Sequence, residues 1–297
     1  LTSIGLLLSN HTTKFSFKNY EKSCPLLTTL LRSIVNMKNN KKIKLSVVSA
    51  TRNEAENLVR CLESICDIAD EIVIADEQST DRTVEIAKEF GARIISVPHS
   101  DNFHITKNIA IDAAKGDWIL QLDADEIVSP ELSREIKSVI SRPSSVSGYW
   151  LNRRNWFLTR FLTKGGQYPD STLRLYRKGK GHLPAHDVHE QAVVKGLVGH
   201  LKHDLLHYRD TSFEKYLDGF NRYSSFIANQ MHKQNLNFGI WHTINHLTIK
   251  PLLVFLNIYF RHRGYVDGMP GFIFALYSGL IYPVAYIKFW QHTRYPT

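Results

Sequence analysis

The chain has 297 residues, of which 43% are hydrophobic, and a formal net charge of +9 at pH 7. This length can bury one sizeable core, and the apolar content excludes an intrinsically disordered protein. The cysteines Cys24, Cys61 and Cys66 lack metal-ligand spacing and, being odd in number, cannot all pair, so we expect free thiols in a reducing compartment.

The excess positive charge is confined to the two ends of the chain. Residues 1–44 contain eight Lys or Arg against one acidic residue, and residues 231–297 contain six against one, whereas residues 45–230 contain 23 against 26. The C-terminal end is also apolar and aromatic, which favours an anionic membrane surface over a nucleic acid as its partner. We therefore expect no nucleic-acid partner.

Residues 1–42 form a basic N-terminal extension that precedes the first predicted strand. Its apolar run at residues 4–8 is too short for the apolar region of a secretory signal peptide, so we do not expect secretion. Translation is expected to start at Met37, or Leu1 represents an alternative start codon. The alternative interpretation is a short helix that packs on the following domain.

From residue 43 the hydrophobic pattern alternates between the period of a strand and that of a helix. The predicted strands cover residues 43–49, 71–75, 92–97 and 117–122. Helices are predicted between them, capped by Asn53, capped by Thr80 or Asp81, and at residues 105–114. Repeated units of this kind predict an α/β fold with a mostly parallel sheet covered on both faces.

Polar side chains follow three of these strands, where the carboxyl ends of parallel strands bind ligands. They are Thr51, Arg52, Asn53 and Glu54 after the first strand, Asp76 and Glu77 after the second, and Asp123, Asp125 and Glu126 after the fourth. Converging carboxylates repel one another unless a cation lies between them, and oxygen ligands favour Mg²⁺ or Mn²⁺ with a phosphorylated ligand. The alternative for Asp125 and Glu126 is the start of a solvated loop.

Four segments in order carry a family resemblance: LSVVSATRNEAENL, IVIADEQSTDRT, KNIA and GDWILQLDADE. Together they resemble the motifs of family 2 nucleotide-sugar glycosyltransferases over residues 43–127. GGQYPDSTLRLYRK, DVHEQ and YVDGMPG are similar to the bacterial lipopolysaccharide core β-glucosyltransferase subgroup. The resemblance implies a GT-A domain, assigned to residues 43–230, that uses a divalent metal and inverts the anomeric centre of a nucleotide-sugar, for which we expect a UDP-sugar.

The resemblance also implies roles for individual residues. Thr51, Arg52, Asn53 and Glu54 would bind the donor, Asp76 would contact uracil or ribose, and Lys107 would face the diphosphate. Asp125 would bind the metal, and Asp123 would contact the metal or the ribose. Gln78 replaces a turn glycine that is usual in the family, and Lys107 replaces a common arginine.

An inverting displacement needs a general base that takes the proton of the acceptor hydroxyl. Glu190 matches the family's catalytic carboxylate by position, and Asp187 and Asp170 are the rival candidates. The histidines beside them could instead indicate a zinc site, or the segment could be a solvated loop. Arg174 either binds an anionic acceptor, together with Asp170, or pairs with a local acid.

The C-terminal residues 231–297 contain two apolar runs, at residues 249–260 and 271–290. The second is near the length of a membrane span, with aromatic and basic residues at its ends. We expect helices that lie in the cytoplasmic face of the inner membrane, as a peripheral or monotopic anchor beside a lipid-linked saccharide acceptor such as lipopolysaccharide core. The alternative is a helical subdomain packed on the catalytic core or on a second subunit.

Three other functions would require different sequence features. A sugar-phosphate nucleotidyltransferase would have a glycine-rich loop where residues 50–53 contain no glycine. A processive polysaccharide synthase would have its Gln-x-x-Arg-Trp motif before several spanning helices, but the related residues 291–295 follow the last apolar run. A non-catalytic membrane scaffold with a degenerate transferase domain is the third. The histidines after residue 199 do not indicate a metal cluster.

Overall fold

The computed structural model describes residues 43–100, 102–184 and 191–295. The expectations for residues 1–42, including Met37 and Cys24, lie outside these ranges, and so do those for Asp187 and Glu190. Within them Cys61 is a buried free thiol.

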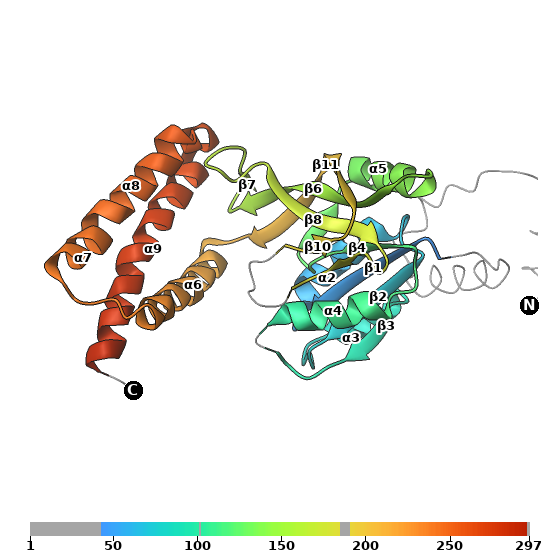
Figure 1. The fold of residues 1–297 in the computed structure, drawn as a ribbon, viewed down its shortest axis with the longest axis horizontal. Helices are drawn as coiled ribbons and strands as arrows, with labels where there is room; N and C mark the ends of the chain where they lie inside the picture. Colours follow the sequence, from blue (N-terminus) through green and yellow to red (C-terminus); the bar gives the residue numbers. More distant parts are fainter. Residues whose placement is uncertain (1–42, 101, 185–190, 296–297) are drawn as a thin grey trace, which may run out of the picture.

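The N-terminal half of the sheet has the predicted parallel arrangement (Figure 1). Its strands are β1 (Leu45–Thr51), β2 (Glu71–Asp76), β3 (Arg93–Ser96) and β4 (Trp118–Gln121), which lie in the order β3-β2-β1-β4. Every neighbouring pair among these four is parallel. The connecting helices are α2 (Ala55–Ile65), α3 (Thr83–Glu89) and α4 (Phe103–Ala113).

The side chains of each strand alternate between two buried faces. On one face, Leu45 and Val47 pack with Leu58 and Ile65 of α2 and with the later helix α5 (Pro130–Ser141). On the other face, Val48 packs with Ala110 and Ile111 of α4. The parallel strands are therefore buried on both sides, which explains their continuous apolar runs.

The second half of the sheet continues from β4 with mixed strand directions. β8 (Asp170–Arg177) pairs antiparallel with β4 and β6 (Val146–Phe157), β6 pairs parallel with β11 (Leu197–Asp210), and β11 pairs antiparallel with β5 (Glu126–Val128). The short strand β7 (Arg160–Phe161) joins β6, and β9 (Gly181–His182) pairs with β10 (Val193–Val194) in a small second sheet. This half forms the opposite wall of the site described below.

The chain then forms a helical region beside the sheet domain (Figure 1). It starts with α6 (Phe213–Lys233), so the boundary predicted at residue 230 falls inside a helix. The helix continues into this region because Tyr216 and Phe220 pack against Tyr277 of α9 (Gly268–Arg294). α6, whose N-cap is Ser212, therefore packs with the helical region, and the predicted domain bounds stay a prediction.

Residues 240–261 form one continuous helix made of four segments. These are α7 (Ile240–Ile244), η3 (Asn245–Ile249), α8 (Lys250–Leu256) and η4 (Asn257–Arg261), of which η3 and η4 are π-helical. The short η5 (Gly264–Asp267) connects this helix to α9. A Cβ at Gly279 would lie 2.5 Å from the carbonyl oxygen of Pro251, so the missing side chain permits the close packing of α8 on α9.

Candidate active site

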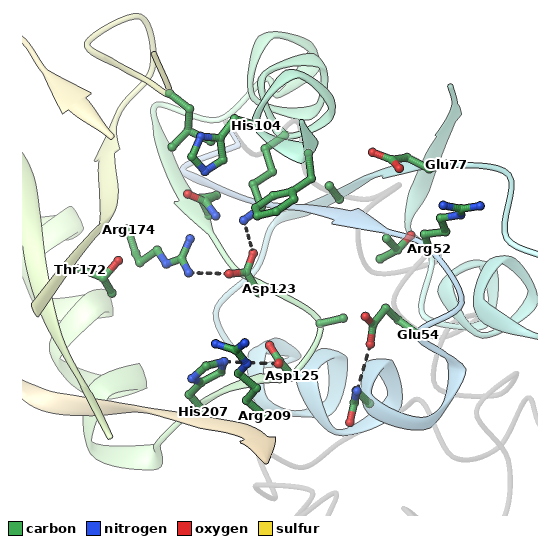
Figure 2. A pocket seen from close by; sticks show the side chains of 18 of the residues that line it. Arg52, Glu54, Glu77, His104, Asp123, Asp125, Thr172, Arg174, His207 and Arg209 are labelled. Atoms are coloured by element: carbon green, nitrogen blue, oxygen red, sulfur yellow. Dashed lines mark hydrogen bonds and ion pairs between the residues drawn. The ribbon is translucent and has the colours of Figure 1, made fainter. Parts of the chain in front are cut away.

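A cleft of about 1070 Å³ lies at the carboxyl ends of the parallel strands (Figure 2). Its walls come from the loop after β1, from α4, from the turn after β4, and from β8, β11 and α6. Several residues predicted from the sequence line it together: Thr51, Arg52, Asn53, Glu54, Lys107, Asp123, Asp125 and Arg174. The location agrees with the rule for ligands of parallel sheets.

The loop after β1 is fixed by bonds to the loop after β2. Asn53 has a left-handed backbone (φ 55°), and its side-chain oxygen accepts hydrogen bonds from the amide and hydroxyl of Thr80. The prediction that Asn53 caps the first helix is therefore wrong, because this side chain bonds across to the neighbouring loop; Glu54 holds the cap position. Burial raises the pKa of Glu54, although a hydrogen bond from Asn57 partly opposes the shift.

Asp76 is buried and is not among the residues that line the cleft. Its carboxylate accepts hydrogen bonds from the hydroxyl of Thr51 at 3.1 Å and from the amide of Ser79 at 2.9 Å. These bonds fix the turn that contains Gln78, whose φ of 56° is the conformation that a glycine adopts without strain. Contact between Asp76 and the nucleotide stays a prediction.

A chain of hydrogen bonds lies along the side of the cleft that the loops after β1 and β3 form. Arg52 Nη1 lies 2.8 Å from His99 Nε2, His99 Nδ1 lies 2.7 Å from Glu77, and Thr106 donates to the other oxygen of Glu77. Burial alone would raise the pKa of Glu77, but the bonds from Thr106 and His99 hold it below its usual value. Arg52 is therefore fixed at the cleft by its bond to His99, which itself bonds to the carboxylate of Glu77.

Asp123 is held between two buried cations (Figure 2). Its carboxylate lies 2.5 Å from Lys107 Nζ and 2.6 Å from Arg174 Nη2. Burial opposes ionisation, but Arg174 and Lys107 outweigh it and hold the pKa of Asp123 far below its usual range. The charge of Asp123 is thus balanced by the protein itself.

Asp125 faces His207, which sequence reasoning missed. The distance between Asp125 Oδ2 and His207 Nε2 is 3.3 Å, and His207 Nδ1 lies 2.7 Å from the side-chain oxygen of Asn155. Burial alone would raise the pKa of Asp125, but the bond and the charge of His207 lower it. Antiparallel pairing of β11 with β5 sets His207 opposite Glu126 and so brings its ring to Asp125.

The sequence held only a weak signal for this position. His207 belongs to the alternating strand pattern of residues 205–209, in which Leu205 and His207 are buried on the same face. In the sequence, His207 is one of several histidines after residue 199, which as a group do not indicate a metal cluster. A buried histidine in a strand that reaches the cleft could have been singled out on that ground.

The two residues predicted to bind the acceptor form internal pairs, and acceptor binding by them stays a prediction. Asp170 accepts hydrogen bonds from Arg153 at 2.7 and 2.9 Å and from Asn155 at 3.0 Å, and it does not line the cleft. Arg174 donates to Asp123 and, at 2.8 Å, to the fully buried Glu126. Of the two interpretations of Arg174, the structure therefore has the pairing with local acids.

Comparison with known proteins identifies a family that matches part of this sequence. Residues 46–192 match the sequence model of "Glycosyl transferase family 2". An uncharacterized glycosyltransferase of Rickettsia typhi is 29% identical over 241 residues, which cover 77% of this chain and 81% of that protein. The lipopolysaccharide core biosynthesis glycosyltransferase LpsC of Rhizobium meliloti is 29% identical over 248 residues, covering 81% and 89%.

Two further similarities cover different shares of this chain and of the other protein. A TPR repeat-containing protein of Synechococcus elongatus is 40% identical over 135 residues, which cover 45% of this chain and 32% of that protein. The crystal structure of S. aureus TarS 1-349 in complex with UDP aligns with a TM-score of 0.43 at 16% identity, covering 85% of this chain and 89% of that one.

The family match agrees with the motifs quoted from the sequence, and the observed α/β sheet with its C-terminal helical region confirms the predicted fold class. The loop after β1, the turn after β4 and the carboxylates of Asp123 and Asp125 all fall within the matched residues. Residues 46–192 of this chain therefore form a domain of glycosyl transferase family 2.

Proposed function

We propose that this protein transfers a sugar, with inversion, from a UDP-sugar to a hydroxyl group of a lipid-linked saccharide such as lipopolysaccharide core. The observation that carries the proposal is the pair Asp125 and His207, which face each other in the cleft at the carboxyl ends of the parallel strands. The similarity to LpsC, named as a lipopolysaccharide core biosynthesis glycosyltransferase, supports the acceptor class.

Asp125 and His207 are suitable ligands for a divalent cation. Carboxylate oxygen and neutral imidazole nitrogen are both ligands of Mn²⁺, and Mg²⁺ accepts the carboxylate and completes its shell with phosphate oxygens and water. The other ring nitrogen, Nδ1, would donate to the side-chain oxygen of Asn155 and so orient the imidazole as outer ligands do in metal sites. When bound, the ion would neutralise the charge that develops on the leaving diphosphate.

The neighbouring residues divide the remaining tasks. Asp123 is already neutralised by Lys107 and Arg174, so Asp125 is the better metal ligand of the two carboxylates, and Asp123 is left to contact the ribose. Thr51, Arg52, Asn53 and Glu54 form the nucleotide wall. Glu190 is proposed as the general base, with Asp187 as its rival; both lie outside the described residues.

The first experiment measures thermal stabilisation of the purified protein by UDP with and without Mn²⁺. A ligand at about 100 times its Kd stabilises a protein by about 2.7 kcal/mol. We expect metal-dependent stabilisation that is lost in Asp125→Ala and His207→Ala. His203→Ala is the matched control, because His203 lies on the same strand but pairs with Glu135 outside the cleft. Stabilisation by UDP in both site variants would contradict the metal assignment.

The catalytic assignment is tested separately by transfer of radiolabelled sugar to rough lipopolysaccharide. Glu190→Gln is expected to abolish transfer while it leaves the UDP-dependent stabilisation intact, because a base acts on the acceptor and not on nucleotide binding. Asp187→Asn should retain transfer. Loss of transfer in Asp187→Asn alone would move the base to Asp187. Transfer that survives in Asp125→Ala would support neither assignment and would contradict the mechanism.

We further propose that the helical region binds the cytoplasmic face of the inner membrane as a monotopic anchor. Apolar side chains are exposed along the helix of residues 240–261: Trp241 (77%), Leu252 (57%), Leu253 (58%) and Phe260 (57%). Among the described residues, one helix, Gly264–Arg294, is long and apolar enough to cross a membrane. However, Lys288 within it donates to Asn221, Ser224 and Ser225 of α6, which supports packing on the protein rather than a span.

The membrane proposal is tested by sedimentation with vesicles of phosphatidylglycerol and phosphatidylcholine. The double variant Trp241→Ser/Leu253→Ser is expected to remain in the supernatant, because apolar burial supplies most of the binding of a monotopic helix. Leu197→Ser, at a 65% exposed position on β11, is the control and should sediment like the wild type. Equal sedimentation of all three proteins would contradict the assignment of this face.

A further inference from the structure

The charges that line the cleft do not all find partners within the protein. Lys107 and Arg174 pair with Asp123, Arg153 pairs with Asp170 and Glu126, and Arg52 bonds to His99. These four cations therefore have partners within the protein. Three further cations, Arg209, Lys215 and Arg222, line the same cleft.

These three side chains form no hydrogen bond or salt bridge with any residue that the structure describes. The charges of Arg209 and Lys215 act at longer range on the half-buried Asp210, and that of Lys215 acts also on Glu54. Like charges gathered in one place destabilise a folded protein unless an anion or solvent compensates them. The cluster is therefore a candidate site for an anionic ligand.

The backbone arranges the three cations on one surface. Arg209 lies on the same face of β11 as His207 and lines the same cleft as Asp125 (Figure 2). Lys215 and Arg222 lie seven residues apart on α6, and Gly219 lies between them on the same face. A Cβ at Gly219 would lie 3.8 Å from Arg209 Nη2, so the glycine leaves the guanidinium group close to the helix.

The position of α6 distinguishes this cluster from the donor site. The nucleotide wall comes from the loops after β1 and β2, whereas α6 leads from the sheet domain to the helices with the exposed apolar face (Figure 1). A lipid-linked acceptor that approaches from those helices reaches α6 before it reaches the donor. Two guanidinium groups and one ammonium group are well suited to a phosphate, which accepts several charge-assisted hydrogen bonds.

We propose that Arg209, Lys215 and Arg222 bind a phosphate group carried by the saccharide acceptor. The proposal rests on the proposed function, because it specifies the acceptor for the same cleft. The class of acceptor is therefore a phosphorylated saccharide, and the cluster holds its phosphate so that the neighbouring hydroxyl reaches the donor sugar.

The test uses glucose 6-phosphate as the probe, with glucose as the uncharged comparison. Binding is measured by ligand-observed NMR on the full chain, without UDP and with saturating UDP and Mg²⁺. We expect glucose 6-phosphate to bind in both conditions and glucose not to bind. Arg222→Gln and Lys215→Gln should each weaken binding about tenfold or more, which is the loss of one charge-assisted bond.

Two matched variants make the result specific. Lys233→Gln removes the same charge at the other end of α6, outside the cleft, and should bind the probe like the wild type. Arg222→Lys keeps the charge and should retain most of the affinity. Unchanged UDP affinity in Arg222→Gln shows that the variant is folded and that the cluster is separate from the donor site.

Two outcomes would overturn the proposal, and a third would overturn the proposed donor while it supports the phosphate site. If UDP displaces glucose 6-phosphate, or if Arg222→Gln weakens UDP equally, the cluster binds the donor diphosphate. If Arg222→Gln binds the probe like the wild type but sediments less with phosphatidylglycerol vesicles, the cluster serves lipid headgroups. If UDP fails to bind while Arg222 still governs probe binding, the proposed donor is wrong and the phosphate site stands.

Discussion

Arg174 offers a sharp test of how the cleft is held together. Arg174→Ala removes the hydrogen bonds to Asp123 and Glu126, at 2.6 and 2.8 Å. Asp123 keeps Lys107 as a partner, but the fully buried Glu126 keeps only Arg153 at 3.3 Å and the amide of Asp123 at 2.9 Å. Removing one partner of a buried ion pair costs about 3–5 kcal/mol. Because Glu126 retains Arg153 as a cationic partner, we expect a loss at the lower end of this range, about 3 kcal/mol.

The free energy of unfolding is measured by urea denaturation at pH 7.5, with the m-value compared between variants. Arg134→Ala is the control, since this 74% exposed side chain pairs only with Glu131 on the helix surface and should change stability by less than about 0.5 kcal/mol. The double variant Arg174→Ala/Glu126→Gln should lose less than the sum of the single variants. A loss below about 1 kcal/mol in Arg174→Ala would refute the reasoning.

Three other predictions concern the scaffold. Gln78→Gly is expected to stabilise the fold by roughly 0.5–1 kcal/mol in urea denaturation, because glycine adopts the φ of 56° without strain; a destabilised variant would contradict this. Burial alone would raise the pKa of Glu71, but the hydrogen bonds that it accepts from Ser46, Lys115 and Arg93 lower it. Its stabilising contribution is therefore complete above the usual glutamate pKa of 4.5 and is lost as the pH falls through the lowered folded value. Glu71→Gln should accordingly lower the Tm at pH 7 and reduce the dependence of Tm on pH between 5 and 3, and a parallel pH profile would oppose that. Gly279→Val should destabilise the packing of α8 on α9 by about 1–3 kcal/mol, since its Cβ would overlap the Pro251 carbonyl, whereas the neighbouring Leu280→Val should not.

Much of the sheet domain could be predicted from local patterns. The strands expected at residues 43–49, 71–75, 92–97 and 117–122 correspond to β1, β2, β3 and β4 with shifts of one or two residues at their ends. These elements are readable because each buries an apolar face whose period appears in the sequence. Asn53 was misassigned because its side chain had an alternative partner, Thr80, in a different loop.

The candidate site divides in the same way. The carboxylates after β4 were recognisable because the sequence crowds Asp123, Asp125 and Glu126 at the end of a buried strand. The different environments of these carboxylates could not be recognised from the sequence, because the environments depend on side chains from β8, β11 and α4. The same holds for Arg174, for which the sequence left two interpretations open, and pairing with local acids is what the structure contains.

The sequence by itself determined the alternation of strands and helices, the edge of the sheet at which ligands bind, and the apolar character of the C-terminal region. Those properties follow from periodicity and composition, which are local. Only the tertiary structure decided that His207 meets Asp125 and that Arg209 shares a surface with Lys215 and Arg222. These contacts depend on the pairing of β11 with β5 and on the course of α6, and such long-range registers are set by the packing of the whole domain, not by any one segment.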